Sequence, residues 1–311
     1  MEYKSLKERC NRIIENMYAK LYEEKQCIAA YLLGSASHDI LWEWSDIQIA
    51  VILDDGYKGK RYYTLLEEGM CVVLNIYTLT EFKEFIGAIH VDDFMWKAFS
   101  KCKKILSKDC ILDELLDEAF YIGEVDKQKE MLLGFSGAVY YLNKAEKNLY
   151  IKENIENAIY FIPQIAENIA LIEIFKNKQI PERELITQGK KLNSEIFQKI
   201  YDPLFQGAVD YDIIKGILEN CVSYLEDNTK LVYEPIISYL EKHGNLENFK
   251  FETRAHGFGI NYEWLVRCGI AEHYGIPEKI SFLKQVEKLG YRMKFCNINN
   301  TLTIREHFKN K

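Results

Sequence analysis

The spacing of apolar residues predicts two kinds of element in the first 120 positions. Where apolar residues recur every three or four positions, an amphipathic helix is expected, and such stretches cover residues 4–26, 60–68, 80–89 and 111–120. Short apolar runs bounded by Gly or Asp are typical of buried strands, and they cover residues 27–33, 46–53, 71–77 and 104–106. This alternation is the pattern of an α/β or α+β domain over residues 1–120.

The pattern changes after residue 120. Helical periodicity dominates with almost no strand signal, most clearly over residues 127–147, 152–177, 195–201 and 229–243. We therefore expect a helical bundle domain over residues 121–245. Residues 246–311 form a small C-terminal module with two helix candidates, 262–274 and 277–289, and a hairpin candidate formed by 292–298 and 301–304. Helix, helix and hairpin resemble a winged helix in outline.

Charge is distributed unevenly. The chain has a net charge of −7, yet its last 62 residues hold eleven Lys and Arg against six Glu. An acidic body disfavours general binding to nucleic acid, while the basic C-terminal module leaves DNA binding open as a local property. No apolar run reaches the roughly 18–20 residues that span a bilayer, and the charged N-terminus does not look like a signal peptide. We expect a cytoplasmic protein with no membrane partner.

Cysteine spacing gives no metal or disulfide signal. None of the eight cysteines forms a Cys-x-x-Cys pair, so we expect reduced thiols that act as small apolar side chains.

One segment has the composition of a phosphate and metal site. Gly34 and Ser35 end the apolar run 27–33, and Ser45 and Asp46 begin the next run. Glycine permits a tight turn and close approach of the backbone to phosphate oxygens. Positions 46 and 48 lie two apart on a strand, so their side chains project from the same face. Two carboxylates there would hold Mg²⁺ against the phosphates of a nucleoside triphosphate.

The same segment resembles the nucleotidyltransferase superfamily, which includes DNA polymerase beta and the aminoglycoside nucleotidyltransferases. That family shows Gly-Ser, about nine residues, and then Ser-Asp-Ile followed by Asp or Glu, and this chain has Gly34-Ser35, nine residues, and Ser45-Asp46-Ile47. Residues 72–78 resemble the strand that carries a third carboxylate in kanamycin nucleotidyltransferase-like proteins, and residues 105–116 resemble the end of their domain. The resemblance covers about residues 25–120.

The chain departs from the family at two of the three metal-binding positions. Gln48 stands where the family places its second carboxylate, and Val73, or Asn75 in the alternative alignment, stands where it places the third. Asp46 is then the one remaining metal ligand. Nucleotidyl transfer depends on metal ions that neutralise charge on phosphate, so the resemblance implies a catalytically impaired protein. It also implies Glu167, in the helical domain, as the general base of an active enzyme.

Three functions remain open from the sequence. The first is a noncatalytic protein that binds a nucleotide or a partner in a cleft between the first two domains. The second is an active Mg²⁺-dependent enzyme that uses Asp46 and Glu167 to modify a small hydroxyl acceptor such as an aminoglycoside. The third is a DNA-binding regulator that acts through the C-terminal module. A homodimer is left open.

The remaining aromatic and loop residues are interpreted mainly as structural residues. Tyrosines at helical spacing are usually core or interface residues, and Tyr140, Tyr141, Tyr150 and Tyr160 are interpreted in that way. Trp42 and Trp44 would cover the sheet edge or pack between domains, with stacking on a base as the functional alternative. His38 and Asp39 share the same loop and are interpreted as surface residues.

Overall fold

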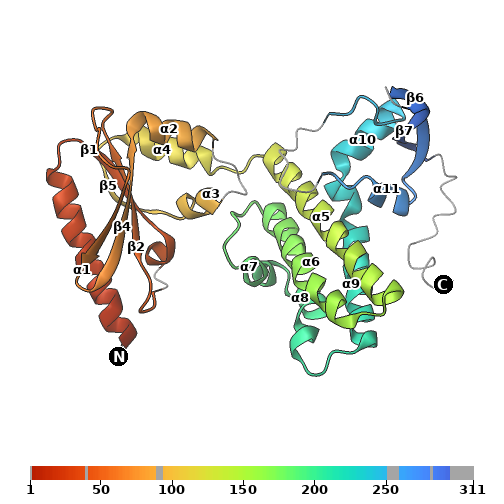
Figure 1. Ribbon diagram of the computed structural model, residues 1–311, viewed down its shortest axis with the longest axis horizontal. Helices are drawn as coiled ribbons and strands as arrows, with labels where there is room; N and C mark the ends of the chain where they lie inside the picture. Colours follow the sequence, from red (N-terminus) through yellow and green to blue (C-terminus); the bar gives the residue numbers. More distant parts are fainter. Residues whose placement is uncertain (1, 39–40, 89–93, 251–258, 281–282, 295–311) are drawn as a thin grey trace. The chain divides into compact units, whose positions relative to one another are not determined.

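A computed structural model of the 311-residue chain describes all residues except 1, 39–40, 89–93, 251–258, 281–282 and 295–311. The chain forms two compact units, Met1–Tyr121 and Ile122–Lys311. We refer to them as unit 1 and unit 2 and describe each by itself (Figure 1).

Unit 1 is an α+β unit built on a mixed five-stranded sheet, the kind of sheet that the resemblance to the nucleotidyltransferase superfamily implies. Its strands are β1 (Cys27–Leu33), β2 (Ile47–Leu53), β3 (Tyr62–Glu67), β4 (Met70–Thr78) and β5 (Lys103–Ser107). Their order in the sheet is β3-β4-β2-β1-β5. β2 and β4 are parallel, and the other neighbouring pairs are antiparallel.

The helix predicted over residues 60–68 is wrong, because most of this segment is strand β3. Tyr62, Tyr63 and Thr64 favour an extended backbone. Glu68 and Gly69 both have positive φ, 48° and 76°, which suits a two-residue hairpin turn into β4. Pairing with β4 along the whole of β3 therefore outweighs the three-residue spacing between its tyrosines and its leucines.

Helices cover both faces of the sheet (Figure 1). α1 (Glu2–Glu23) packs its apolar stripe on one face, against inward-facing residues such as Ile49 and Val51. α2 (Leu79–Ala88) and α4 (Cys110–Ala119) supply Phe82 and Leu112 to a second core on the opposite face. The short α3 (Phe94–Phe99) adds Phe99 to this second core. The period of two along β2 divides its residues between the two cores.

Unit 2 is mainly helical. Its elements are α5 (Glu124–Glu146), the π-helical turn η2 (Lys147–Ile151), α6 (Ile155–Lys176), α7 (Leu185–Leu192), α8 (Ser194–Ile200), the 3₁₀ turn η3 (Asp202–Phe205), α9 (Tyr211–Val232) and α10 (Glu234–His243). α5 and α6 pack closely at Gly137, where an added Cβ would lie 2.1 Å from Oδ1 of Asn168. Among the described residues α6 alone has the length and composition of a membrane span, yet 56% of its most apolar window is buried inside unit 2.

The described part of residues 246–311 packs into unit 2 as α11 (Glu263–Arg267), β6 (Ala271–Ile280) and β7 (Leu283–Met293). Trp264 of α11 is buried and donates from Nε1 to Oγ1 of Thr229 at 2.8 Å. Tyr233 donates to the carbonyl oxygen of Asn261 at 2.8 Å. The first bond joins α11 to α9, and the second joins Tyr233, the residue after α9, to the segment that leads into α11.

The helix predicted over residues 277–289 is wrong, and the one predicted over 262–274 is shorter than expected. The last residues of the 262–274 candidate lie in β6, and the 277–289 candidate lies mostly in β6 and β7, which pair antiparallel. Pro277 suggests the first turn of a helix, but either strand of a two-stranded sheet is an edge, where a residue without an N–H is tolerated. The winged-helix outline is thus not confirmed. The predicted hairpin of 292–298 and 301–304 lies almost wholly outside the described residues.

Candidate functional site

The residues singled out in unit 1 meet at one end of three neighbouring strands. β1 ends at Leu33, directly before Gly34, while β2 begins at Ile47, directly after Asp46. Leu33 pairs with Gln48 across the antiparallel β1–β2 ladder. A Cβ added to Gly34 would lie 4.0 Å from Cδ of Gln48. The turn that the motif predicts therefore lies beside the degenerate position of β2.

Gly34 has the backbone conformation that the motif requires. Its φ is +68°, in the left-handed region where side chains with a Cβ are strained. It opens the 3₁₀ turn η1 (Gly34–His38), and its carbonyl oxygen accepts a hydrogen bond from the Ser37 hydroxyl at 2.7 Å. Ser35 is half-buried at the second position of this turn. The turn is thus fixed by its own hydrogen bond before any ligand binds.

Ser45 has a structural role in the loop that leads to β2. Its side chain is buried, and its hydroxyl accepts a hydrogen bond from the Trp42 backbone N–H at 3.1 Å. Its own N–H donates to the Trp42 carbonyl oxygen at 2.9 Å. Trp42 and Trp44 are strongly exposed, so the prediction that they cover the sheet edge is not met within unit 1. Asp39, in the same loop, lies outside the described residues.

Asp46 is partnered by an amide. Nε2 of Gln48 donates to Oδ2 of Asp46 at 3.0 Å, in a half-buried position. An ionised carboxylate only accepts hydrogen bonds, so the amide nitrogen is the end of Gln48 that faces it. In the family pattern, a second carboxylate stands at this place and shares a cation with the first. Here a neutral donor supplies the partner of Asp46 directly.

Val73 lies beside Gln48. The two residues are register partners on the parallel strands β2 and β4, so their side chains project from the same face. Val73 is buried. Asn75 is half-buried two positions along the same strand and pairs with Ala50 instead. The register therefore places Val73, rather than Asn75, next to the Asp46–Gln48 pair.

The side chains at this end of the sheet do not fit a protein-held Mg²⁺ ion. Mg²⁺ demands near-octahedral oxygen ligands and is usually bound by one or two carboxylates together with substrate phosphates. Asp46 offers one carboxylate that is already hydrogen-bonded, and Val73 offers no ligand. Within the part of the chain that the structure describes, no group of three His, Cys, Asp or Glu residues could hold a metal ion.

Glu167 belongs to unit 2. It is exposed near the middle of α6. Glu173, two turns further along, is buried instead and accepts a hydrogen bond from the Tyr224 hydroxyl at 2.7 Å. Burial, followed by the charge of Glu173, raises the pKa of Tyr224 above its ordinary value. The role of Glu167 as a general base stays a prediction.

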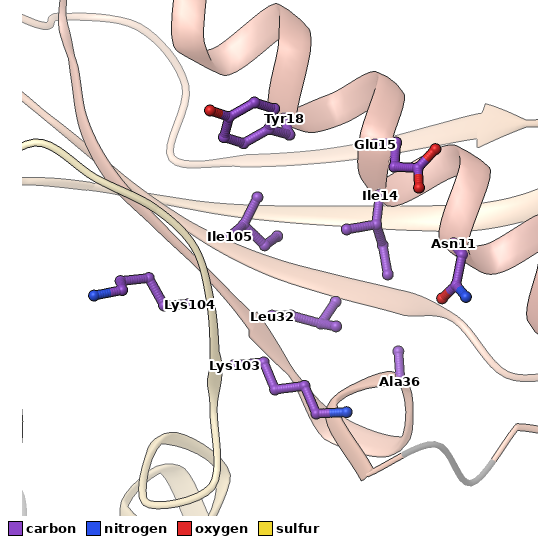
Figure 2. Close-up of a pocket in the computed structure, with 9 residues that line it drawn as sticks. All are labelled: Asn11, Ile14, Glu15, Tyr18, Leu32, Ala36, Lys103, Lys104 and Ile105. Atoms are coloured by element: carbon purple, nitrogen blue, oxygen red, sulfur yellow. The ribbon is translucent and has the colours of Figure 1, made fainter.

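A cavity of about 370 Å³ lies on the other face of the sheet (Figure 2). It is bounded by one face of α1, by Leu32 of β1, by Ala36 of η1 and by Lys103 of β5. Figure 2 shows the Lys103 amine close to the η1 turn that carries Ala36. Leu32 belongs to the core under α1, whereas Gln48 alternates onto the opposite face. The sequence pattern gave no signal for this cavity, because its residues come from separate elements.

Comparison with known proteins supports the fold. The chain is similar to the crystal structure of a nucleotidyltransferase-like protein from Exiguobacterium sibiricum, with a TM-score of 0.56 and 13% sequence identity. The match covers 93% of this chain and 99% of that one. Neither a family model nor a curated protein sequence matches the chain. The likeness is one of fold, and it confirms the nucleotidyltransferase-like assignment at that level, without distinguishing the aminoglycoside-type subgroup.

Proposed function

We propose that this chain is a noncatalytic protein of nucleotidyltransferase-like fold that binds a nucleotide at the Gly34–Ser35 turn without a catalytic Mg²⁺ ion. The observation that carries the proposal is the hydrogen bond from Gln48 to Asp46 beside the buried Val73. It replaces the three-carboxylate arrangement with one charge, one neutral amide and one apolar side chain.

The retained turn supports nucleotide binding. Gly34 has the left-handed φ that this tight turn requires, and glycine adopts it without strain. A backbone that is already turned can present its N–H groups to phosphate oxygens at little further entropic cost. Because the phosphate then meets one carboxylate rather than three, it needs less help from a divalent cation to overcome charge repulsion.

The reduced carboxylate set argues against transfer chemistry. The transition state of nucleotidyl transfer requires cations that bridge the phosphate and the attacking oxygen. Asp46 would have to be the only carboxylate ligand that these three positions offer to such an ion, and it would have to give up its hydrogen bond from Gln48 to bind the metal. We expect metal affinity to be lowered so far that the reaction is not supported.

The test is calorimetric titration of the full-length protein with ATP and with GTP, in the presence of Mg²⁺ and in the presence of EDTA. We expect binding of similar strength in both conditions, and its loss in Ser35→Glu, which places a negative charge in the turn. An exposed control, Ser5→Glu on α1, keeps the added charge away from the turn. Robust Mg²⁺-dependent transfer of a nucleotide to any hydroxyl acceptor would overturn the proposal.

The other functions named from the sequence stay predictions. Transfer to a small hydroxyl acceptor such as an aminoglycoside requires that Asp46→Ala and Glu167→Gln both abolish activity. DNA binding through residues 246–311 requires an affinity that falls steeply with salt. A protein partner, a homodimer and a cytoplasmic location are likewise left as predictions.

A further inference from the structure

Unit 2 contains a cavity of about 590 Å³ between α5, η2 and α6. We call it the α5–α6 cavity. Four aromatic rings line it: Tyr140, Tyr141, Tyr160 and Phe161. Neighbouring rings lie 5.2 to 6.3 Å apart between centroids. Tyr160 is 65% exposed and Tyr140 is 41% exposed. The sequence-based interpretation of these two tyrosines as core or interface residues is therefore wrong for the core, and an interface role stays a prediction. Exposed rings at a cavity mouth offer flat faces to a planar ligand.

The charges of the cavity are positive. Lys144 and Lys152 both line it, and none of its lining residues is Asp or Glu. Nζ of Lys144 lies 5.1 Å from the ring centroid of Tyr140. Asn157, at the third position of α6, also lines the cavity and places the positive end of a 22-residue helix at its rim. This arrangement favours an anionic group and disfavours a polycation such as an aminoglycoside.

Two amide oxygens in the lining have no hydrogen-bond partner within the described residues. Nδ2 of Asn148 donates to the Lys144 carbonyl oxygen at 2.8 Å, which fixes the orientation of the amide. Its Oδ1 is buried and unpartnered, although the side chain as a whole is only 5% exposed. Oε1 of Gln164, from α6, is buried and unpartnered as well. Burying such acceptors without a partner costs about 1–3 kcal/mol each. Both atoms are closed off from solvent in this conformation, so a ligand with N–H donors would offset the cost once the lining opens far enough for its donors to reach them.

The backbone beside Asn148 is irregular. α5 passes into the π-helical turn η2, where the Lys152 N–H donates to the Lys147 carbonyl oxygen at 3.2 Å. Glu153 follows with a positive φ of 49°. π-Helical turns are rare and frequently occur at functional sites. The irregular turn places Asn148 and Lys152 at the same cavity although they are four residues apart.

We propose that the α5–α6 cavity binds a nucleoside monophosphate. The base stacks on the exposed tyrosine rings, its N–H groups donate to Asn148 and Gln164, and its phosphate pairs with Lys144 and Lys152. An apolar ligand would leave the two oxygens unpaired, and an aromatic ring without an anionic group would not use the lysines. The volume lies within the range of small-molecule sites. The site is independent of the Gly34–Ser35 turn in unit 1.

The first test is calorimetric titration of the full-length protein with 5′-AMP, 5′-UMP and ribose 5-phosphate. The amino group of AMP carries two N–H donors, one for each oxygen, whereas uracil has a single ring N–H. We expect AMP to bind roughly tenfold more tightly than UMP and ribose 5-phosphate to bind more weakly than either. Equal affinities for AMP and ribose 5-phosphate would overturn the proposal, as would binding only to an oligonucleotide.

Variants then assign the binding to the cavity. Tyr160→Ala removes a stacking face and should weaken AMP binding roughly tenfold, and Lys152→Ala should weaken it while raising its tolerance to salt. Both side chains are exposed, so the fold should be kept. Matched controls are Tyr121→Ala, whose ring is 74% exposed, and Lys215→Ala on the exposed side of α9. An unchanged affinity in Tyr160→Ala would refute the site.

Gln164→Leu tests the amide oxygens separately, because it removes an acceptor at similar volume. We expect the preference for AMP over UMP to shrink, and an undiminished preference would contradict the role of Gln164. Ser35→Glu distinguishes the two nucleotide sites: it should abolish ATP binding at unit 1 and leave AMP binding at the α5–α6 cavity intact. Loss of AMP binding in Ser35→Glu would show that unit 1 holds the AMP.

Discussion

Restoring the missing carboxylates should convert unit 1 into a metal site, and this change tests the reasoning about the degenerate positions most directly. The perturbation is Gln48→Asp together with Val73→Asp. The two positions are register partners on neighbouring parallel strands, and the first is hydrogen-bonded to Asp46. The double variant therefore places three carboxylates on one face within two residues of one another along the strands.

The expected magnitude follows from the strand spacing. Neighbouring strands lie about 4.8 Å apart, and two like charges about 5 Å apart repel by about 3 kcal/mol at an effective dielectric constant of about 20. With two such neighbouring pairs and no cation, unit 1 should lose about 6 kcal/mol of stability, a large part of what a domain usually has. Mg²⁺ at about 100 times its dissociation constant would return about 2.7 kcal/mol.

The assay is urea unfolding of the wild type and the double variant in EDTA and at increasing Mg²⁺ concentration. Labelling of the Cys27 thiol, which is buried in unit 1, follows the transition, because Trp42 and Trp44 are already exposed in the folded protein. The matched control is Gln48→Asn with Val73→Asn, which changes size and polarity similarly without adding charge. We expect a Mg²⁺-dependent gain in the double Asp variant and no gain in the wild type or the Asn control.

Two results would refute the reasoning. If the wild type gains as much stability from Mg²⁺ as the double Asp variant does, Asp46 already holds a cation despite its bond to Gln48. If the double Asp variant is stable in EDTA and insensitive to Mg²⁺, the three positions are not close enough to share an ion. In that event the register-based placement of Val73 would have to be abandoned in favour of Asn75.

Three further predictions concern unit 1 and α9. Gly34→Ala should destabilise unit 1 by about 1 kcal/mol, because φ is +68° at this position. Gly216 of α9 has open space where a Cβ would lie, so Gly216→Ala should stabilise unit 2 by roughly 0.5–1 kcal/mol. The urea midpoint of each variant checks these two expectations. Two hydrogen bonds from the first turn of α2 hold the pKa of Asp55 below its usual value. A depressed carboxyl pKa stabilises the folded state above the unfolded pKa, and this stabilisation is lost as pH falls through the folded pKa. Asp55→Asn should therefore flatten the acid limb of the stability profile measured from pH 7 to pH 3. Burial raises the pKa of Cys102 to about 11, and Cys110 is the exposed thiol among the described cysteines, so iodoacetamide at pH 8 should label Cys110 first in timed mass spectrometry.

Much of unit 1 could be predicted from apolar spacing, because its strands are short apolar runs with clear turn residues. The exception, β3, shows where the method fails. The tyrosines and leucines of residues 60–68 lie three positions apart, as on a helix face. The side chains of β3 are nevertheless largely exposed, so its conformation is set by pairing with β4 rather than by its own apolar face. Pro277 misled the prediction in a similar way, because an edge strand and a helix start both tolerate a missing N–H.

The candidate sites show the same limit at the level of side chains. The sequence predicts that Asp46 and residue 48 share a face, since that follows from strand periodicity alone. It could not decide between Val73 and Asn75, because only the register of β4 against β2 places one of them beside Gln48. Nor could it find the α5–α6 cavity, because helical spacing does not show that Tyr140 and Tyr160 are exposed, and no local pattern predicts the π-helical turn beside them.

The two sites lead to different expectations about what selection would keep. If the protein depended on chemistry at the sheet, a substitution such as Gln48 would abolish its function, because a neutral amide cannot replace a charged ligand of Mg²⁺. The buried amides of Asn148 and Gln164 impose a cost on stability that no bond among the described residues offsets. The turn at Gly34 carries no such cost, because glycine adopts a φ of +68° without strain and the Ser37 hydroxyl donates to its carbonyl oxygen. Binding without transfer accounts for both features, since a ligand would satisfy the buried oxygens and use a turn that is already formed, while the lost carboxylates would no longer matter.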